Sequence, residues 1–439
     1  MSSIQSYLVI FFLVLTPLAK AEVKTSFFAE GLSFLSPDYN DIDQKNFYFL
    51  GVKFKSDTRT NDAFKIDLTS TYAINKTVLS YTNPRELSYA FEVGDSSQLI
   101  IGRHLHIWSA LDSFWTYSFI QPVFKWNSLD PKNQGLTGLF YQYRSGALSL
   151  MFYGSPLYIP DQGASYEIKD GQFEAGNPFF QPPPQNLKFQ GQVLPIDYNI
   201  ERPKTEDIVF RTSFGAQLRY GENKGYFAQG SAVSKPSNQL ALGYKGILVT
   251  TRVRVDVQPK TYTENIYAAD LGYRDDWGFV LISALYDQPK DPEFDTAYNA
   301  PHFEASTVWG PQFLYKMAPF EFLLAYMDTS GGKITETGPD VASDRKSLSQ
   351  RFLFKQAALA GITFSQTFEK QYRLDSSFQY KFSPREAYRQ IRFRNDLNLS
   401  GPWAFWVDLL LIDTNSDIES GYEATKNRDQ IWFGTNYDL

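Results

Sequence analysis

Apolar and polar residues alternate along most of the chain, most regularly in its last third. In the segment 373–382, one parity carries Leu374, Phe378, Tyr380 and Phe382, and the other carries Arg373, Asp375, Gln379 and Lys381. A period of two predicts β-strands whose two faces meet different surroundings. The charged faces would be out of place in the core of a soluble sheet. We therefore expect a closed sheet that surrounds water and turns its apolar face outward.

The connections between these segments tend to alternate between short and long. Short turns lie at 221–225, 245–246, 274–276, 317–319 and 400–402, and long connections lie at 108–134, 155–206, 287–301, 328–347 and 413–427. Transmembrane barrels have short periplasmic turns and long extracellular loops. The pattern predicts an all-β fold in residues 22–439: a single antiparallel up-and-down transmembrane barrel of about 16 to 20 strands, best estimate about 18. Both termini are then periplasmic.

The amino end predicts an exported protein. An apolar run over residues 7–18 precedes Ala19-Lys20-Ala21, which is typical of a signal-peptide cleavage site, so we expect a signal peptide at residues 1–21. Mean hydropathy is −0.34 although 17% of residues are aromatic, and the chain has no cysteine. A net charge of −6 disfavours a nucleic-acid partner. We expect the protein in the lipid bilayer of a Gram-negative outer membrane.

Arginines recur on the inward parity of the expected strands, including those at 208–220 and 247–257. The candidate pore-lining residues are Arg211, Arg219, Arg252, Arg254, Asp256, Arg373, Arg392 and Arg394. One interpretation is a row of cations that concentrates anions. The alternative is that these arginines pair with Asp256, Asp375 and Asp396 and stiffen the barrel wall.

The connection 155–206 is long, rich in proline and rich in aromatic residues. Its candidate constriction residues are Tyr158, Tyr166, Phe173, Phe179 and Phe180. Because such long loops usually bind or gate, we expect this loop to fold into or over the pore. The alternative is an external cap or a contact surface for another protein.

Residues for catalysis are sparse. The histidines are His104, His106 and His302, and no metalloprotease, nucleophile-elbow, Walker or dinucleotide motif occurs. Two histidines on one strand face make a weak metal signal without a third ligand. We expect no catalytic residues, no metal site and no cofactor, and keep an outer-membrane hydrolase built on His106 and Ser109 as a minor alternative.

Two segments resemble known outer-membrane proteins. Ile431, Phe433, Tyr437 and Leu439 share a parity and resemble the final strand that the outer-membrane assembly machinery recognises in Gram-negative barrels, although Leu439 replaces the usual terminal Phe. The segment 102–108, GRHLHIW, resembles the G-R-x-x-x-x-W strand of porin-like and exopolysaccharide-export barrels. These resemblances imply the assembly machinery as a partner and a channel as the function.

Together the patterns predict an outer-membrane channel for the passive passage of small polar or anionic solutes. The alternative is a barrel scaffold with an occluded lumen, whose long extracellular loops bind a partner or a polysaccharide. A barrel of this size encloses water, whereas an eight-stranded barrel is filled by side chains.

Overall fold

A computed structural model describes residues 23–35, 45–56, 63–180, 182–338, 351–352, 354–369, 371–414 and 428–439. The predicted signal peptide lies outside these residues. Eighteen strands form one closed sheet. In the order in which they neighbour one another, they are β1 (Val23–Phe34), β2 (Asn46–Ser56), β3 (Phe64–Ala73), β4 (Tyr81–Glu92), β5 (Ser97–His104), β8 (Leu136–Ser145), β9 (Leu148–Ser155), β15 (Ser213–Tyr220), β16 (Gly225–Pro236), β19 (Thr263–Asp275), β20 (Gly278–Lys290), β22 (Ser306–Met317), β23 (Phe320–Gly331), β25 (Gln356–Phe368), β26 (Tyr372–Ser383), β27 (Tyr388–Leu399), β28 (Trp403–Thr414) and β29 (Gln430–Asp438).

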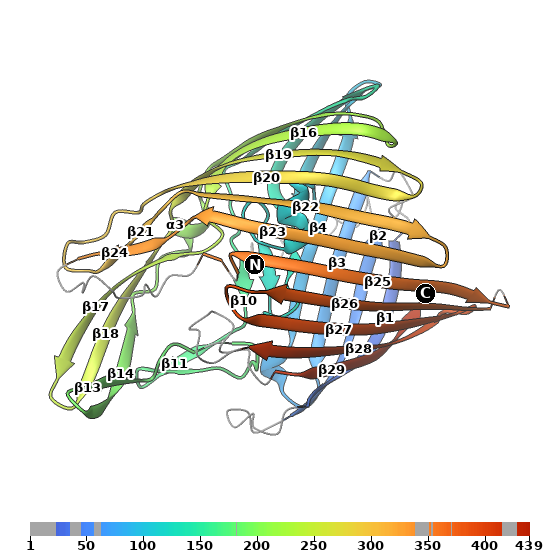
Figure 1. Cartoon of the computed structure of the whole chain (residues 1–439). Helices are drawn as coiled ribbons and strands as arrows, with labels where there is room; N and C mark the ends of the chain where they lie inside the picture. The colour runs from blue at the N-terminus through green and yellow to red at the C-terminus, as the bar shows by residue number, and fades with distance from the viewer. Residues whose placement is uncertain are drawn as a thin grey trace, which may run out of the picture.

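The barrel closes where its last strand meets its first. β29 pairs antiparallel with β1, and the Leu439 backbone N–H donates to the Thr25 carbonyl at 2.9 Å. Both termini of the barrel therefore lie at the end that carries the short turns, which we call the inner end. The long connections leave the opposite, outer end (Figure 1). The predicted fold, with its 18 antiparallel strands, is confirmed.

The two faces of the strands differ as their alternation predicted. In β15, Phe214 and Leu218 are at least half exposed on the outside, whereas Ser213 and Gln217 are buried inside. Apolar side chains are likewise exposed on the outside of β26 and β27, at Phe378 and Phe393. An apolar outer band is the surface that lipid requires, because a charge at the bilayer midplane costs roughly 2 to 4 kcal/mol. No helix among the described residues is long and apolar enough to cross a membrane.

The interior holds a segment of the chain that we call the inserted loop, residues 105–135 between β5 and β8. It contains helix α2 (Ala110–Trp115) and the short strands β6 (Val123–Lys125) and β7 (Lys132–Asn133). Its apolar side chains pack against inward-facing residues of the barrel strands, from β5 through β28 in chain order, in one buried cluster. The inserted loop contributes Trp108, Leu111, Trp115, Phe119 and Ile120 to this cluster. The barrel is therefore narrowed from within by this loop.

A second sheet stands beyond the outer end of the barrel. It consists of β13 (Asn186–Phe189), β14 (Gln192–Ile200), β18 (Arg252–Lys260) and β17 (Ala241–Val249), and we call it the projecting sheet (Figure 1, lower left). The prediction of a barrel strand at 247–257 is therefore wrong. The segment contains a turn at Thr250, whose φ is 50°, and its two halves belong to β17 and β18. Residues 245–246, expected to form a turn, lie inside β17 instead. Thr is rarely found at positive φ, so the residue pattern did not indicate a turn at Thr250.

Smaller elements complete the outer end. They are the 3-10 helix η1 (Thr77–Leu79), β10 (Gln162–Gly163), β11 (Glu167–Lys169), β12 (Gln172–Glu174), α3 (Thr205–Val209), β21 (Ala300–Phe303) and β24 (Ile334–Thr337). β10 pairs in parallel with β6 of the inserted loop, so the connection 156–212 contacts the inserted loop directly.

Candidate functional site

A cavity of about 820 Å³ lies inside the barrel, and we call it the lumen cavity. Its walls are the inward faces of β1 to β4 and β27 to β29, and residues of the inserted loop close its remaining side. Along its length it runs from Lys24 and Asp438 at the inner end to Trp126 and Trp432. The cavity exists because the inserted loop packs against the opposite half of the barrel and leaves this half unfilled.

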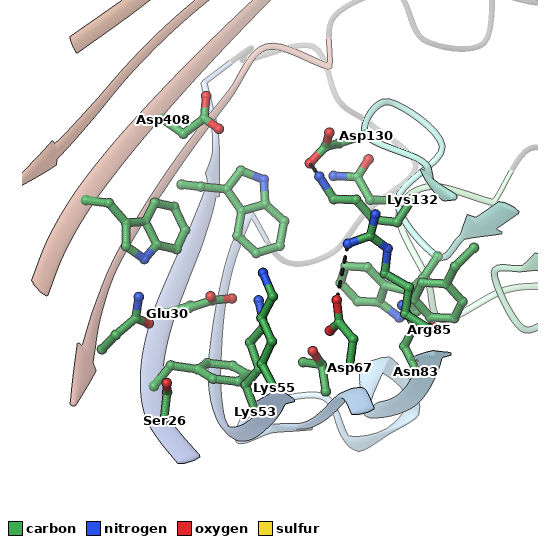
Figure 2. Close-up of a pocket in the computed structure, with 18 of the residues that line it drawn as sticks. Ser26, Glu30, Lys53, Lys55, Asp67, Asn83, Arg85, Asp130, Lys132 and Asp408 are labelled. Atoms are coloured by element: carbon green, nitrogen blue, oxygen red, sulfur yellow. Dashed lines mark hydrogen bonds and ion pairs between the residues drawn. The ribbon is translucent and has the colours of Figure 1, made fainter. Parts of the chain in front are cut away.

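Charged side chains from many strands converge on the lumen cavity (Figure 2). Seven of the lining residues are basic: Lys24, Lys53, Lys55, Arg85, Lys132, Arg392 and Arg394. Five are acidic: Glu30, Asp67, Asp130, Asp408 and Asp438. The lining therefore carries two more basic than acidic residues, although the whole chain has a net charge of −6.

Sequence reasoning missed five of the seven basic lining residues, among them Lys53 and Lys55. Both come from β2 and point into the cavity side by side (Figure 2). Among the residues that the structure describes, neither has a carboxylate within ion-pairing distance. The signal was present in the sequence, because Tyr48, Leu50 and Val52 occupy the opposite, outward parity. Unpaired ammonium groups in a cavity leave their charge available to a solute.

The arginines of β27 are bound into the wall. Arg392 donates from Nε to both carboxylate oxygens of Asp408 at 3.0 Å, and its Nη1 lies 3.2 Å from Asp130. Arg394 binds Asp396 through two nitrogens, at 2.8 and 2.7 Å. Bidentate pairs of this kind fix the geometry of both partners. Arg392 and Arg394 line the cavity, and their ion pairs favour the wall-stiffening interpretation for them.

Asp130 ties the inserted loop to the wall. Besides Arg392, its carboxylate contacts Lys132 at 2.7 Å. Burial opposes ionisation of Asp130, but Lys132 and Arg392 together outweigh it and lower the pKa of Asp130 to about 2. On the facing wall, Arg85 donates from Nε to the Asn133 carbonyl at 2.8 Å and pairs with Asp67 at 3.2 Å. The end of the inserted loop is therefore held from both sides of the cavity.

The root of the inserted loop is fixed by buried hydrogen bonds. The Asp112 carboxylate accepts the backbone N–H groups of Phe119 and Ile120, each at 2.9 Å. The Trp108 carbonyl accepts from Ser231 and from Gln229 of the wall, at 2.5 and 3.3 Å. Buried polar groups of a loop must find such partners, so these bonds hold the backbone inside the barrel.

At the outer end, an aromatic cluster lies between the lumen cavity and the long connections. It joins Phe47 and Phe49 of β2 to Trp126 of the inserted loop and to Phe179. The rings of Phe49 and Trp126 are 5.8 Å apart, and those of Trp126 and Phe179 are 5.7 Å apart. This cluster narrows the outer end of the lumen.

The predicted constriction residues separate into two groups. Tyr158 and Phe179 are buried inside the barrel, in the two main apolar clusters. Phe173 instead packs beside Tyr198 of the projecting sheet, with ring centroids 5.1 Å apart, and the rings of Tyr166 and Phe180 also contact Phe173. Only part of the connection 155–206 therefore enters the barrel. The inserted loop occupies the half of the interior opposite the lumen cavity, which the sequence did not predict.

The other predicted pore-lining residues do not reach the lumen cavity. Arg252, Arg254 and Asp256 belong to β18 of the projecting sheet, so their predicted place in the barrel wall is wrong. Arg211 precedes β15 and donates to the Asp207 carbonyl at 2.7 Å. Arg219 faces inward from β15 and stacks on Phe227 at 5.1 Å, and Arg373 pairs with Asp375 at 2.9 Å near the inner end.

The histidines are engaged in hydrogen bonds. His104 Nδ1 lies 3.0 Å from a Glu86 oxygen, and His106 Nε2 lies 2.8 Å from the Gln217 side-chain oxygen. Burial lowers the pKa of His106 to about 4, so its ring is neutral and donates from Nε2. Within the described part of the chain, no group of three or more metal-ligating side chains comes together.

No protein-family model matches the chain, and no curated protein matches it significantly. Solved structures with a similar overall shape include the outer membrane protein OpdK from Pseudomonas aeruginosa, with 12% sequence identity, 95% of this chain and 99% of that chain covered, and a TM-score of 0.46. A BenF-like porin from Pseudomonas fluorescens Pf-5 has 9% identity, coverage of 96% and 99%, and a TM-score of 0.45. OccK3 (OpdO) from Pseudomonas aeruginosa has 11% identity, coverage of 98% and 98%, and a TM-score of 0.45. Because identities and TM-scores are this low, the function must be inferred from this chain's own residues.

Proposed function

We propose that this protein is a channel of a Gram-negative outer membrane, through which small polar and anionic solutes pass without an energy source. The lumen cavity carries the proposal. At about 820 Å³ it is large enough to hold a small organic molecule. The excess of basic residues in its lining attracts anions. The carboxylates in its lining that are paired with basic residues can still accept hydrogen bonds from uncharged polar solutes.

Lys53 and Lys55 supply the preference for anions in this proposal. Arg392 and Arg394 are occupied by Asp408 and Asp396, so their charges are largely compensated. The two lysines lack such partners among the described residues and lie on one strand, so they act together on a solute that passes β2. An anion gains attraction there without displacing an existing ion pair.

The outward residues of β29 fit recognition by the outer-membrane assembly machinery. Phe433 is 44% exposed on the outside of the last strand, and β29 also provides the closing pair with β1. We infer that this strand is the one that the machinery engages before the barrel closes. Replacement of Phe433 by Ser should lower the yield of folded protein in cell envelopes but not in detergent refolding, and equal losses in both would contradict this role.

A second function is favoured by the aromatic cluster of Phe47, Phe49, Trp126 and Phe179 at the outer end. If these rings close the lumen, the barrel is a scaffold whose outer loops bind a partner. Recording from protein reconstituted in planar bilayers separates the two functions. Stable current steps are expected for a channel. A barrel that shows heat-modifiable migration on gels, and is thus folded, yet remains electrically silent would favour the scaffold.

A further inference from the structure

The end of the projecting sheet exposes apolar side chains to the outside. β14 and β18 run parallel, with Ile196 beside Val253, so the turns 190–191 and 250–251 lie at the same end of the sheet. We call the residues around these turns the apolar tip: Leu187, Phe189, Val193, Ile247, Leu248 and Val249, which are between 38% and 64% exposed. The tip lies beyond the outer end of the barrel (Figure 1).

The same sheet buries its other apolar residues. Ile196, Tyr198, Tyr244 and Val257 form a compact cluster nearer the barrel. The sheet can therefore fold around its own core without the apolar tip. Single exposed apolar residues are common, but a group of six at the end of two adjacent hairpins marks a contact surface.

The strands of the projecting sheet carry more basic than acidic residues. The strands of the projecting sheet carry five basic residues, Lys188, Lys245, Arg252, Arg254 and Lys260, against two acidic residues, Asp197 and Asp256. Their excess of positive charge contrasts with the negative net charge of the chain. Lys188 directly precedes Phe189, and Arg252 and Arg254 begin β18 beside the tip. Arg252 pairs with Asp197 and Arg254 with Asp256, each at 2.8 Å, so Lys188 is the basic residue nearest the tip that has no ion pair among the described residues. Apolar side chains flanked by basic ones are typical of segments that lie in the headgroup region of anionic membranes.

We propose that the apolar tip inserts into the headgroup region of an anionic phospholipid bilayer that faces the barrel from outside. A second copy of the chain is the less suitable occupant. β13 and β17 are edge strands of the sheet, and edge-to-edge pairing of two copies would use backbone groups. Such pairing would not bury the apolar side chains at the turns, whereas insertion of the turns into a bilayer would bury them. This role goes beyond the proposed channel function and does not depend on it.

The proposal is tested with the whole protein in nanodiscs of neutral phosphatidylcholine, mixed with vesicles and separated by flotation. Wild-type protein should float with vesicles that contain phosphatidylglycerol, less so at high salt, and not with vesicles of phosphatidylcholine alone. The double variant Phe189→Ser with Leu248→Ser should bind about ten- to a hundredfold more weakly, because two half-exposed apolar side chains lose their burial. The double variant Lys188→Gln with Arg252→Gln should bind about 30-fold more weakly.

The matched control is Val78→Ser, which removes a 47% exposed apolar side chain from another outer connection. It should float like the wild type, as should any variant in which only the lumen cavity is changed. Heat-modifiable migration on gels establishes that each tip variant is folded. Wild-type protein that ignores anionic vesicles overturns the proposal. So does flotation that survives both double variants, or association of nanodiscs with one another in place of vesicle binding.

Discussion

Neutralising Lys53 and Lys55 should abolish the preference of the channel for anions. The lining of the lumen cavity has an excess of two basic residues, so the double variant Lys53→Gln with Lys55→Gln leaves it balanced, and the Glu double variant inverts it. Two unit charges about 8 Å from an ion shift its free energy by about 1 kcal/mol in water. Salt at about 0.1 M screens roughly half of this shift.

An anion is therefore favoured by about 0.5 kcal/mol and a cation disfavoured by the same amount, which gives a permeability ratio of about fivefold. Reversal potentials measured in a potassium chloride gradient across a planar bilayer report this ratio. It should be about five for the wild type, near one for the Gln variant and about one fifth for the Glu variant. The charge-matched control, Lys169→Gln with Lys188→Gln, lies outside the lumen and should retain the wild-type potential. A wild-type potential in the folded Glu variant would refute the role of these lysines.

Three further perturbations address the inserted loop. Asp130→Asn should destabilise the barrel above pH 4, because the pKa of Asp130 is lower in the folded than in the unfolded state. The loss should be about 1 kcal/mol once solvent screening of the 31% exposed side chain is considered. In thermal melts, the difference in stability between variant and wild type should vanish as pH falls from about 4 to about 2, and a pH-independent difference would exclude the ion pair as its cause. Trp126→Ala should raise single-channel conductance, because it removes a ring from the aromatic cluster that narrows the lumen. Phe173→Ala, beside the projecting sheet, should leave conductance unchanged. The reverse outcome would assign the constriction to the connection 155–206. Asp112→Ala should lower the free energy of unfolding by about 3 kcal/mol, since the buried N–H groups of Phe119 and Ile120 lose their acceptor. The stability is measured from the temperature at which heat-modifiable gel migration is lost, and a loss below about 1 kcal/mol would contradict the role of Asp112 in holding the inserted loop.

The barrel could be predicted from sequence because one local rule governs each of its strands. A strand between lipid and a polar interior must place Phe214 and Leu218 on one parity and Ser213 and Gln217 on the other. The same rule, applied to the strand 46–56, would have identified Lys53 and Lys55. The rule failed at 247–257, because the alternation of Arg252 and Val253 is equally compatible with a strand outside the barrel.

The inserted loop could not be predicted because its position depends on contacts between distant parts of the chain. The Trp108 carbonyl is held by Gln229 and Ser231, more than 100 residues away. The aromatic residues of the connection 155–206 gave a comparable local signal, yet Phe173 lies beside the projecting sheet. How far each of two aromatic loops enters a barrel is decided by the shape of the interior, and that shape depends on strands that are distant in the sequence.

The central claim is that β2 presents Leu50 to lipid and Lys53 to an aqueous lumen that solutes can reach. The absence of cysteine from the chain makes thiol labelling a direct test. In reconstituted liposomes, a charged, water-soluble maleimide should modify Lys53→Cys rapidly and leave Leu50→Cys unmodified. Rapid modification of Leu50→Cys together with protection of Lys53→Cys would contradict the claim.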